Sequence, residues 1–348
     1  MAGELKGPGE ALSRLDKLEN SPVSPELTKD LAALHTIYAS GVGSLDAGER
    51  AGLMERHGFF AQVALSYGVA ADDDPRKSIE QSGERVVIRA GVAGLILLLV
   101  LAASLALFIT GIVLICMGKI QRAYQPDPAA SSAFLEGFAV YLVVFIAFGL
   151  GMRLLKLDVI TWDWLALLII PLVWHWTTRR GVTPQQQLAA FGWYTGRGIP
   201  FEMALGLAGY LACLPIEVVG MIISVKLIKI THADPTHPII GMFGGGIWQI
   251  LAIYGLACGL APVLEETMFR GALFHHLRRR WGWAVSTGLV SLIFAAIHPQ
   301  GWTMIPALGS VAVVLAILRE WRGSIIAPMT AHAFSNFVTV SLGLLLLR

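Results

Sequence analysis

The chain has 348 residues, of which 55% are hydrophobic and 14% are charged. Soluble domains carry roughly 25% charged residues, and the mean hydropathy here is +0.65, so the composition excludes a water-soluble protein and predicts a polytopic membrane protein. The net charge of +2 is too small, and the basic residues too scattered, for a nucleic-acid-binding surface. The three cysteines lack CxxC spacing, so neither a disulfide framework nor a zinc ribbon is indicated.

The first 85 residues contain no long apolar run and no secretory signal peptide. Apolar residues recur at helical spacing over 10–18, 25–39 and 46–67, between Ser-Pro and Gly breaks. Residues 71–77 are predicted to form a turn or linker. We therefore expect a small helical region over residues 1–85 that stays outside the membrane, in the cytosol.

About eight apolar runs follow, against the ~20 residues needed to cross a bilayer, and those at 159–177 and 284–298 are the short ones. The runs cover residues 86–117, 134–152, 159–177, 203–228, 246–269, 284–298, 302–319 and 324–347. The expected fold class is all-α, a transmembrane bundle of about eight spans with a small N-terminal extramembrane region. Lys and Arg flank the runs on both sides, so they do not orient the spans. A multi-pass protein of the bacterial plasma membrane is expected.

Glu265 and Glu266 stand side by side near the end of an otherwise apolar run. A charged side chain in the middle of a span costs roughly 2.5–3.5 kcal/mol on translocon scales, so these residues are a functional-site hypothesis. Arg270 lies one helical turn after Glu266 on the same face, whereas Glu265 points about 100° away. Glu266 can therefore pair with Arg270 while Glu265 is free for chemistry.

Three further polar residues, His298, His332 and Asn336, lie in later apolar runs. Each alone could be a hydrogen-bonded core residue, but buried polar groups need partners, so we expect all three to meet Glu265 in one cavity within the membrane. A carboxylate beside imidazoles in a low-dielectric pocket can hold a water and take its proton, with or without a metal. His and Asn can donate hydrogen bonds to an oxyanion. Peptide hydrolysis inside the membrane is the expected reaction.

These residues closely resemble the CPBP family of intramembrane proteases, which contains the type II CAAX prenyl endopeptidases and the Abi bacteriocin-immunity proteins. The family motifs are Glu-Glu-x-x-x-Arg, Phe-x-x-x-His and His-x-x-x-Asn on separate helices. This chain has them at Glu265–Arg270, Phe294–His298 and His332–Asn336. The resemblance covers about residues 240–348, the expected catalytic core. Residues 86–239 are expected to be accessory transmembrane helices.

The resemblance implies a role for each motif residue: Glu265 as general base, His298 as the group that helps to bind and activate the water, His332 and Asn336 as oxyanion donors, and Glu266 and Arg270 as support for the site. It implies a peptide or protein substrate at the lipid bilayer, of CAAX type or another. Glu265, His298 and His332 could supply three zinc ligands and leave the fourth position to water; a metal-free glutamate mechanism is the alternative. No HExxH is present, which excludes the arrangement of soluble zincins.

Two other functions compete with proteolysis. The same pocket could bind a partner without catalysis, in a membrane scaffold or an immunity-type protein. A proton-coupled transporter could use the Glu and His residues as a relay, although no internal repeat with matching broken helices supports it. Glu217, a further intramembrane carboxylate, fits either a structural hydrogen bond or the lining of a substrate cavity.

Overall fold

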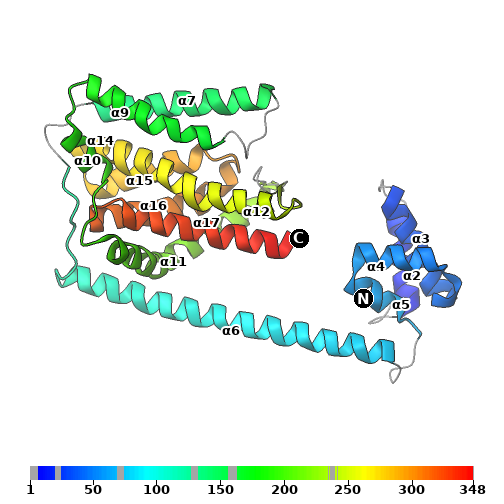
Figure 1. Ribbon diagram of the computed structural model, residues 1–348. Coiled ribbons are helices and arrows are strands. Elements are labelled where there is room, and N and C mark those ends of the chain that lie inside the picture. The colour runs from blue at the N-terminus through cyan, green and yellow to red at the C-terminus, as the bar shows by residue number, and fades with distance from the viewer. Residues whose placement is uncertain are drawn as a thin grey trace. The chain divides into compact units, whose positions relative to one another are not determined.

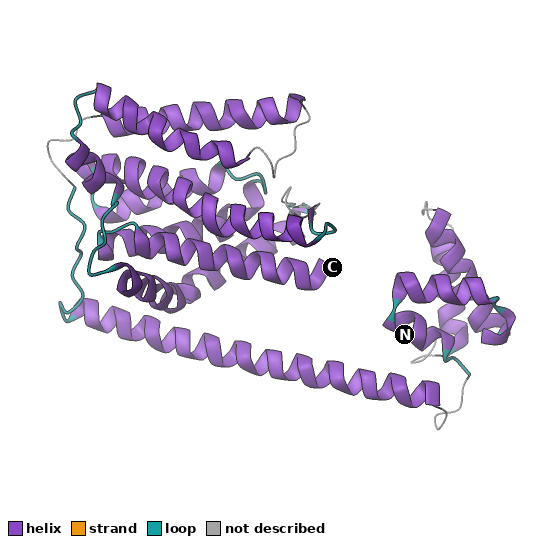
Figure 2. Ribbon diagram, in the orientation of Figure 1, coloured by secondary structure: helices purple, strands orange, loops and turns teal. Residues whose placement is uncertain are grey.

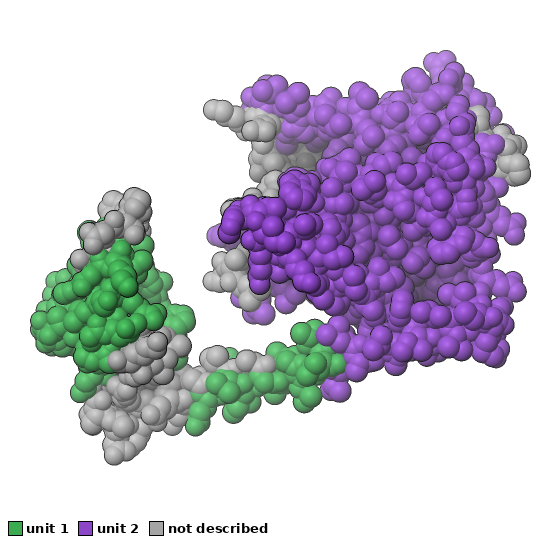
Figure 3. All heavy atoms as spheres, turned by 180° about the vertical axis from the view of Figure 1, so that it is seen from behind, with its two compact units in different colours: residues 1–98 green, residues 99–348 purple. Residues whose placement is uncertain are grey.

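The computed structural model describes residues 7–19, 25–68, 74–126, 132–155, 163–233, 235, 240 and 242–347. Within these ranges every regular element is a helix, which confirms the all-α class (Figures 1 and 2). The chain divides into two compact units, residues 1–98 and 99–348, which Figure 3 colours separately. The division falls within the long helix α6 (Asp74–Cys116).

Before α6, the described residues of the first unit form four short helices and one 3-10 turn. They are α2 (Pro8–Glu19), α3 (Pro25–Ser40), η1 (Val42–Ser44), α4 (Ala47–His57) and α5 (Phe59–Leu65). Helical spacing predicted these helices, but it placed one pattern over 46–67 where the structure has two helices. Gly58 separates them, because its φ of 47° is a conformation that glycine adopts without steric cost. Ile37 and Leu53 are buried at the centre of this unit.

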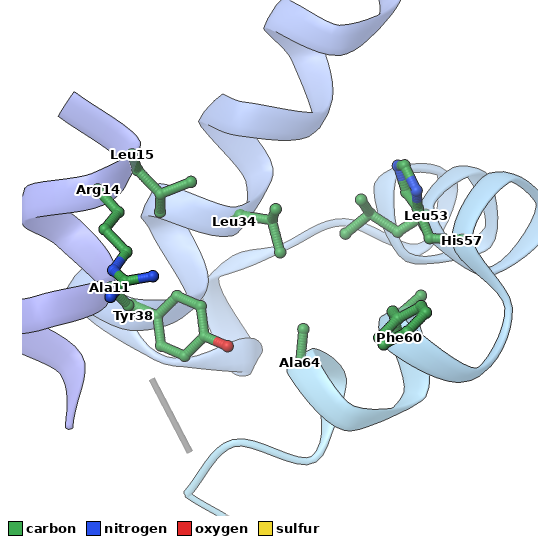
Figure 4. A pocket seen from close by; sticks show the side chains of 10 residues that line it. Ala11, Arg14, Leu15, Leu34, Tyr38, Leu53, His57, Phe60 and Ala64 are labelled. Atoms are coloured by element: carbon green, nitrogen blue, oxygen red, sulfur yellow. The ribbon is translucent and has the colours of Figure 1, made fainter. Parts of the chain in front are cut away.

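Asp30 holds α3 against α4 in this unit. Asp30 is 3% exposed, and its carboxylate accepts hydrogen bonds from Arg56 Nε at 3.1 Å and from His57 Nε2 at 2.9 Å. The hydrogen bond from Arg56 lowers the pKa of Asp30 below its usual value. An apolar cavity of about 240 Å³, with Tyr38 and Phe60 among its walls, lies between the helices (Figure 4).

Helix α6 begins at Asp74, so the expected linker over 71–77 was wrong for residues 74–77, and residues 71–73 lie outside the described part of the chain. Pro75 stands in the first turn, where its missing N–H and fixed φ do not oppose a helix. The polar stretch before the apolar run can therefore be helical. In the second unit, Ser104 Oγ of α6 donates to the carbonyl of Leu211 at 2.6 Å.

The second unit is a bundle of long helices around α16. Its separate elements are α7 (Ala133–Leu155), η2 (Asp163–Leu168), α9 (Ile169–Arg179), α10 (Pro184–Phe191), α11 (Ile199–Thr231), α15 (Trp283–Ala296), η6 (Trp302–Met304), α16 (Ile305–Arg322) and α17 (Ile326–Leu347). One further helix is built from five successive segments, α12 (Ile247–Tyr254), η4 (Gly255–Leu260), α13 (Ala261–Glu266), η5 (Thr267–Leu273) and α14 (Phe274–Arg280). Helix α16 packs against α11, α15 and α17 (Figure 1).

Five helices in the described residues are long and apolar enough to cross a membrane, so the expected eight spans are not confirmed. They are Val87–Cys116, Ala133–Met152, Ile199–Thr231, Ile247–Arg280 and Trp302–Arg322. The run at 284–298 forms the shorter apolar helix α15, and the described part of 159–177 forms η2 and the 11-residue α9. Helix α17 carries His332, Ser335 and Asn336 among its first turns and is not one of the five.

Candidate active site

The two adjacent glutamates lie on α13, between two π-helical segments, η4 before it and η5 after it. Single π turns inside α-helices are frequent at functional sites. At the end of η4 the N–H of Ala261 bonds to the carbonyl of Leu256, five residues back. The next residue is Pro262, which has no N–H, so the carbonyl of Ala257 receives no such bond. Asn336 of α17 supplies the missing donor, because its Nδ2 lies 2.7 Å from the Ala257 oxygen.

Glu266 and Arg270 form the ion pair that their spacing indicated, and both side chains are fully buried. Arg270 Nη1 donates to Glu266 Oε1 at 2.9 Å, and Arg270 Nη2 donates to the carbonyl of Ala312 on α16 at 3.0 Å. Motif spacing did not indicate that the same Glu266 oxygen also accepts from His332 Nδ1, at 2.9 Å. Glu266 therefore joins α13, η5 and α17.

Glu265 faces the other side of the His332 ring. Glu265 Oε2 lies 3.9 Å from His332 Nε2, and the Glu265 side chain keeps 21% of its surface exposed. Oε2 itself is buried, and it has no hydrogen-bond partner among the described residues. A separation of 3.9 Å is too long for a hydrogen bond but is one that a water can bridge.

His298 reaches this region through Phe294. Its Nδ1 donates to the Phe294 carbonyl at 2.6 Å, and its ring lies over the Phe294 ring with centroids 4.4 Å apart. The centroid of the Phe294 ring also lies 6.0 Å from that of the His332 ring and 4.7 Å from the central carbon of the Arg270 guanidinium. The structure thus places Glu265, Glu266 and His332 together and puts both histidines against one phenylalanine. The catalytic roles of these residues remain predictions.

The hydrogen bonds define which imidazole nitrogens carry protons. A neutral imidazole has one N–H, and its position follows from the hydrogen-bond network. In His332 the N–H is at Nδ1, because it donates to a carboxylate; in His298 it is at Nδ1, because it donates to a carbonyl. In the neutral form each ring therefore presents a lone pair at Nε2. Neutral His332 and His298 can each accept a hydrogen bond from water.

Imidazole lone pairs and a carboxylate are the donor types that zinc takes, and a His N–H held by a carboxylate is a common outer-shell arrangement. A zinc site also requires that these side chains converge on one point. Among the described residues, no group of three or more His, Cys, Asp or Glu side chains is placed to hold a metal ion. The arrangement of these side chains does not fit a three-ligand zinc site.

Two residues near the site were not singled out from the sequence. Tyr141 of α7 is 1% exposed, its ring centroid lies 6.0 Å from that of Phe269, and the charge of Glu265 acts on its hydroxyl. Arg319 of α16 is fully buried, and its Nε donates to the Arg270 carbonyl at 3.1 Å. Its charge within an apolar run of the sequence could have indicated that Arg319 has a buried partner. A lone tyrosine in a span is too common to be a signal.

Glu217 lies on α11 and bonds to the Tyr210 hydroxyl, which also bonds to Ser335 of α17. One Glu217 oxygen, Oε1, is buried without a partner in the described part of the chain. Of the two interpretations left open by the sequence, the contact with Tyr210 supports the structural hydrogen bond.

Residues 246–338 match the protein family described as Rce1-like, type II CAAX prenyl endopeptidase Rce1-like. The match contains all three motifs, so this segment is similar to the type II CAAX prenyl endopeptidases, and the five long apolar helices of the described residues indicate an integral membrane protein. Two curated bacterial proteins are similar over a shorter stretch. Uncharacterized protein YpbD of Bacillus subtilis (strain 168) is 34% identical over 76 residues, and the Uncharacterized 24.3 kDa protein of Escherichia coli is 32% identical over 77 residues.

Each of these two matches covers 21% of this chain and 36% of the relative, so the chain spans about a third of the length of the curated relatives it matches. No solved structure matches the chain.

Proposed function

We propose that this protein is an intramembrane endopeptidase that hydrolyses a peptide bond with a water molecule activated by Glu265. The observation that carries the proposal is the unpartnered Glu265 oxygen facing His332 Nε2 across 3.9 Å. The family of residues 246–338, whose description names an endopeptidase, supports the same reaction.

The mechanism follows from two hydrogen-bond acceptors that face each other, Glu265 Oε2 and His332 Nε2. A water between them donates one hydrogen to Glu265 and the other to His332 Nε2, which turns an oxygen lone pair toward the substrate carbonyl. Glu265 takes a proton as the water oxygen bonds to the carbonyl carbon and the carbonyl electron pair moves onto its oxygen. When the intermediate collapses, the C–N bond breaks and the proton passes from Glu265 to the leaving amine. The products are a carboxylic acid and an amine, and the glutamate is regenerated.

Glu266 and Arg270 support this chemistry without taking part in it. The Glu266 carboxylate keeps the His332 proton on Nδ1, and Arg270 offsets the charge of the buried Glu266. The Glu265 side chain keeps 21% of its surface exposed, and no described side chain forms a hydrogen bond with its Oε2.

The proposed substrate is a peptide or protein segment at the membrane, and the family description favours a C-terminal peptide of the CAAX type. The proposed location is a bacterial plasma membrane, with residues 1–85 in the cytosol; the bacterial origin of both curated relatives supports the first of these.

The test compares the purified full chain with Glu265→Gln on a peptide library in detergent, with prenylated and unprenylated members. The amide keeps the size of the side chain but cannot act as a base, so cleavage should fall by about 10²–10⁴-fold, the usual contribution of a general base. Glu217→Gln is the matched control, because it makes the same change at another buried carboxylate, and it should leave cleavage unchanged. Binding of peptides without cleavage by the wild type would indicate the scaffold function instead.

A further inference from the structure

The proposed hydrolysis places a negative charge on the substrate carbonyl oxygen, and such a charge needs hydrogen-bond donors. The site is short of them. The N–H groups of His332 and His298 are used by Glu266 and by the Phe294 carbonyl, and one N–H of Asn336 is used by the Ala257 carbonyl. In their neutral form the two imidazoles therefore face the reacting water as acceptors. Among these groups only the second N–H of Asn336 remains as a donor, so a further donor must come from another element.

Tyr141 of α7 meets this requirement. Its hydroxyl makes no hydrogen bond to any residue that the structure describes, although the side chain is 1% exposed. A hydroxyl on a side chain that is otherwise buried is therefore free to donate a hydrogen bond to a bound molecule. The group is close enough to Glu265 for the carboxylate charge to act on it. Phe269, against which the Tyr141 ring packs, is one helical turn after Glu265 on the same helix.

The ring of Tyr141 is held by aromatic neighbours on both elements. Its centroid lies 5.6 Å from that of Phe138, 5.6 Å from that of Phe145 and 6.0 Å from that of Phe269. Phe269 in turn lies 5.0 Å from Phe294, the ring against which both histidines pack. Side chains locked in this way lose little freedom when they bind a transition state. The Tyr141 ring is thus held in place against Phe269, one helical turn from Glu265.

We propose that Tyr141 is a catalytic residue that donates a hydrogen bond from its hydroxyl to the substrate carbonyl oxygen as the water attacks. This inference rests on the proposed function. The hydroxyl keeps its proton throughout: the bond formed is between the water oxygen and the carbonyl carbon, the bond broken is C–N, and the transferred proton travels through Glu265. Tyr141 lies outside residues 246–338, so the accessory helix α7 would complete a site whose other groups lie within the family segment.

The test uses Tyr141→Phe in the full chain, which removes the hydroxyl and keeps the ring packing. With the library peptide that the wild type cleaves fastest, kcat should fall about 10²-fold, the typical loss for one oxyanion donor, while KM stays within about twofold. A phosphinic analogue of that peptide, tetrahedral and anionic at the scissile position, should bind the variant about 10²-fold more weakly, because analogues of the transition state report interactions made there. The melting temperature should not fall.

Tyr124→Phe is the matched control. Tyr124 belongs to the same buried cluster, but its hydroxyl already shares a 2.6 Å hydrogen bond with His275 Nδ1. This variant should lose melting temperature and keep kcat and analogue affinity. Wild-type kcat and analogue affinity in Tyr141→Phe would overturn the inference and leave the proposed function standing. A wild type that cleaves no peptide would overturn both.

Discussion

His332 Nδ1 lies 2.9 Å from Glu266 Oε1, and Arg270 Nη1 lies 2.9 Å from the same oxygen. One carboxylate oxygen therefore receives both a catalytic-motif histidine and the arginine that offsets its charge. Because all three side chains are buried, the loss of any one leaves polar groups without partners in a low-dielectric interior. The first motif and the third motif are coupled through this oxygen.

We expect Glu266→Ala and Arg270→Ala each to destabilise the protein by about 3–5 kcal/mol, because each strands the opposite charge in the interior. The double variant should recover part of the summed loss. Unfolding in mixed micelles measures the three free energies of unfolding. Strict additivity of the two single effects would show that the residues are not coupled in solution.

Pro262→Ala should lower kcat while leaving the melting temperature unchanged or higher. The new N–H can bond to the Ala257 carbonyl and displace Asn336 from it, whereas proline inside a helix is itself unfavourable. Pro215→Ala, within α11, is the control for removing an intrahelical proline away from the site. An equal effect of the two substitutions on kcat would contradict this role of Pro262.

Gly206→Ala should destabilise the second unit by roughly 1–3 kcal/mol, the usual range for overpacking. A Cβ at Gly206 would lie 2.5 Å from the backbone oxygen of Ala327, which cannot move independently of α17. Gly111→Ala, on α6, meets no atom within 4 Å and should be neutral or slightly stabilising. Thermal unfolding in detergent compares the two. If they shifted the melting temperature alike, close packing of α11 on α17 would be refuted.

The first unit should lose stability in acid through Asp30. Its pKa is lowered in the folded state by the hydrogen bond from Arg56, so its contribution is fully present above the ordinary Asp pKa of about 3.9 and is lost as the pH falls through the lower folded value. Hydrogen exchange of the full chain between pH 5 and 2.5 should show the loss of protection in α3 and α4. Asp30→Asn should lack this pH dependence; if it retained the wild-type profile, another group would be responsible.

Much of the architecture follows from local sequence, because helix formation and membrane insertion depend on periodicity and on summed hydropathy. The N-terminal helices, the all-α class and the long apolar runs were all predictable in this way. Three motifs with fixed internal spacing also indicated the residues of the site, and the spacing of Glu266 and Arg270 indicated their ion pair. The number of spans was not predictable, since short and interrupted runs such as 159–177 look alike in the membrane and outside it.

Only the tertiary structure decided how the motif residues pair, because hydrogen-bond partners depend on distances between helices that sequence spacing does not contain. In the structure His332 shares a hydrogen bond with Glu266 and also lies opposite Glu265. Asn336 donates a hydrogen bond to the Ala257 carbonyl, which Pro262 leaves without a backbone donor. The tertiary structure also packed the ring of Tyr141, 124 positions before Glu265, against the ring of Phe269. Periodicity can predict that a residue faces inward, but which partner it meets is set by the packing of whole helices.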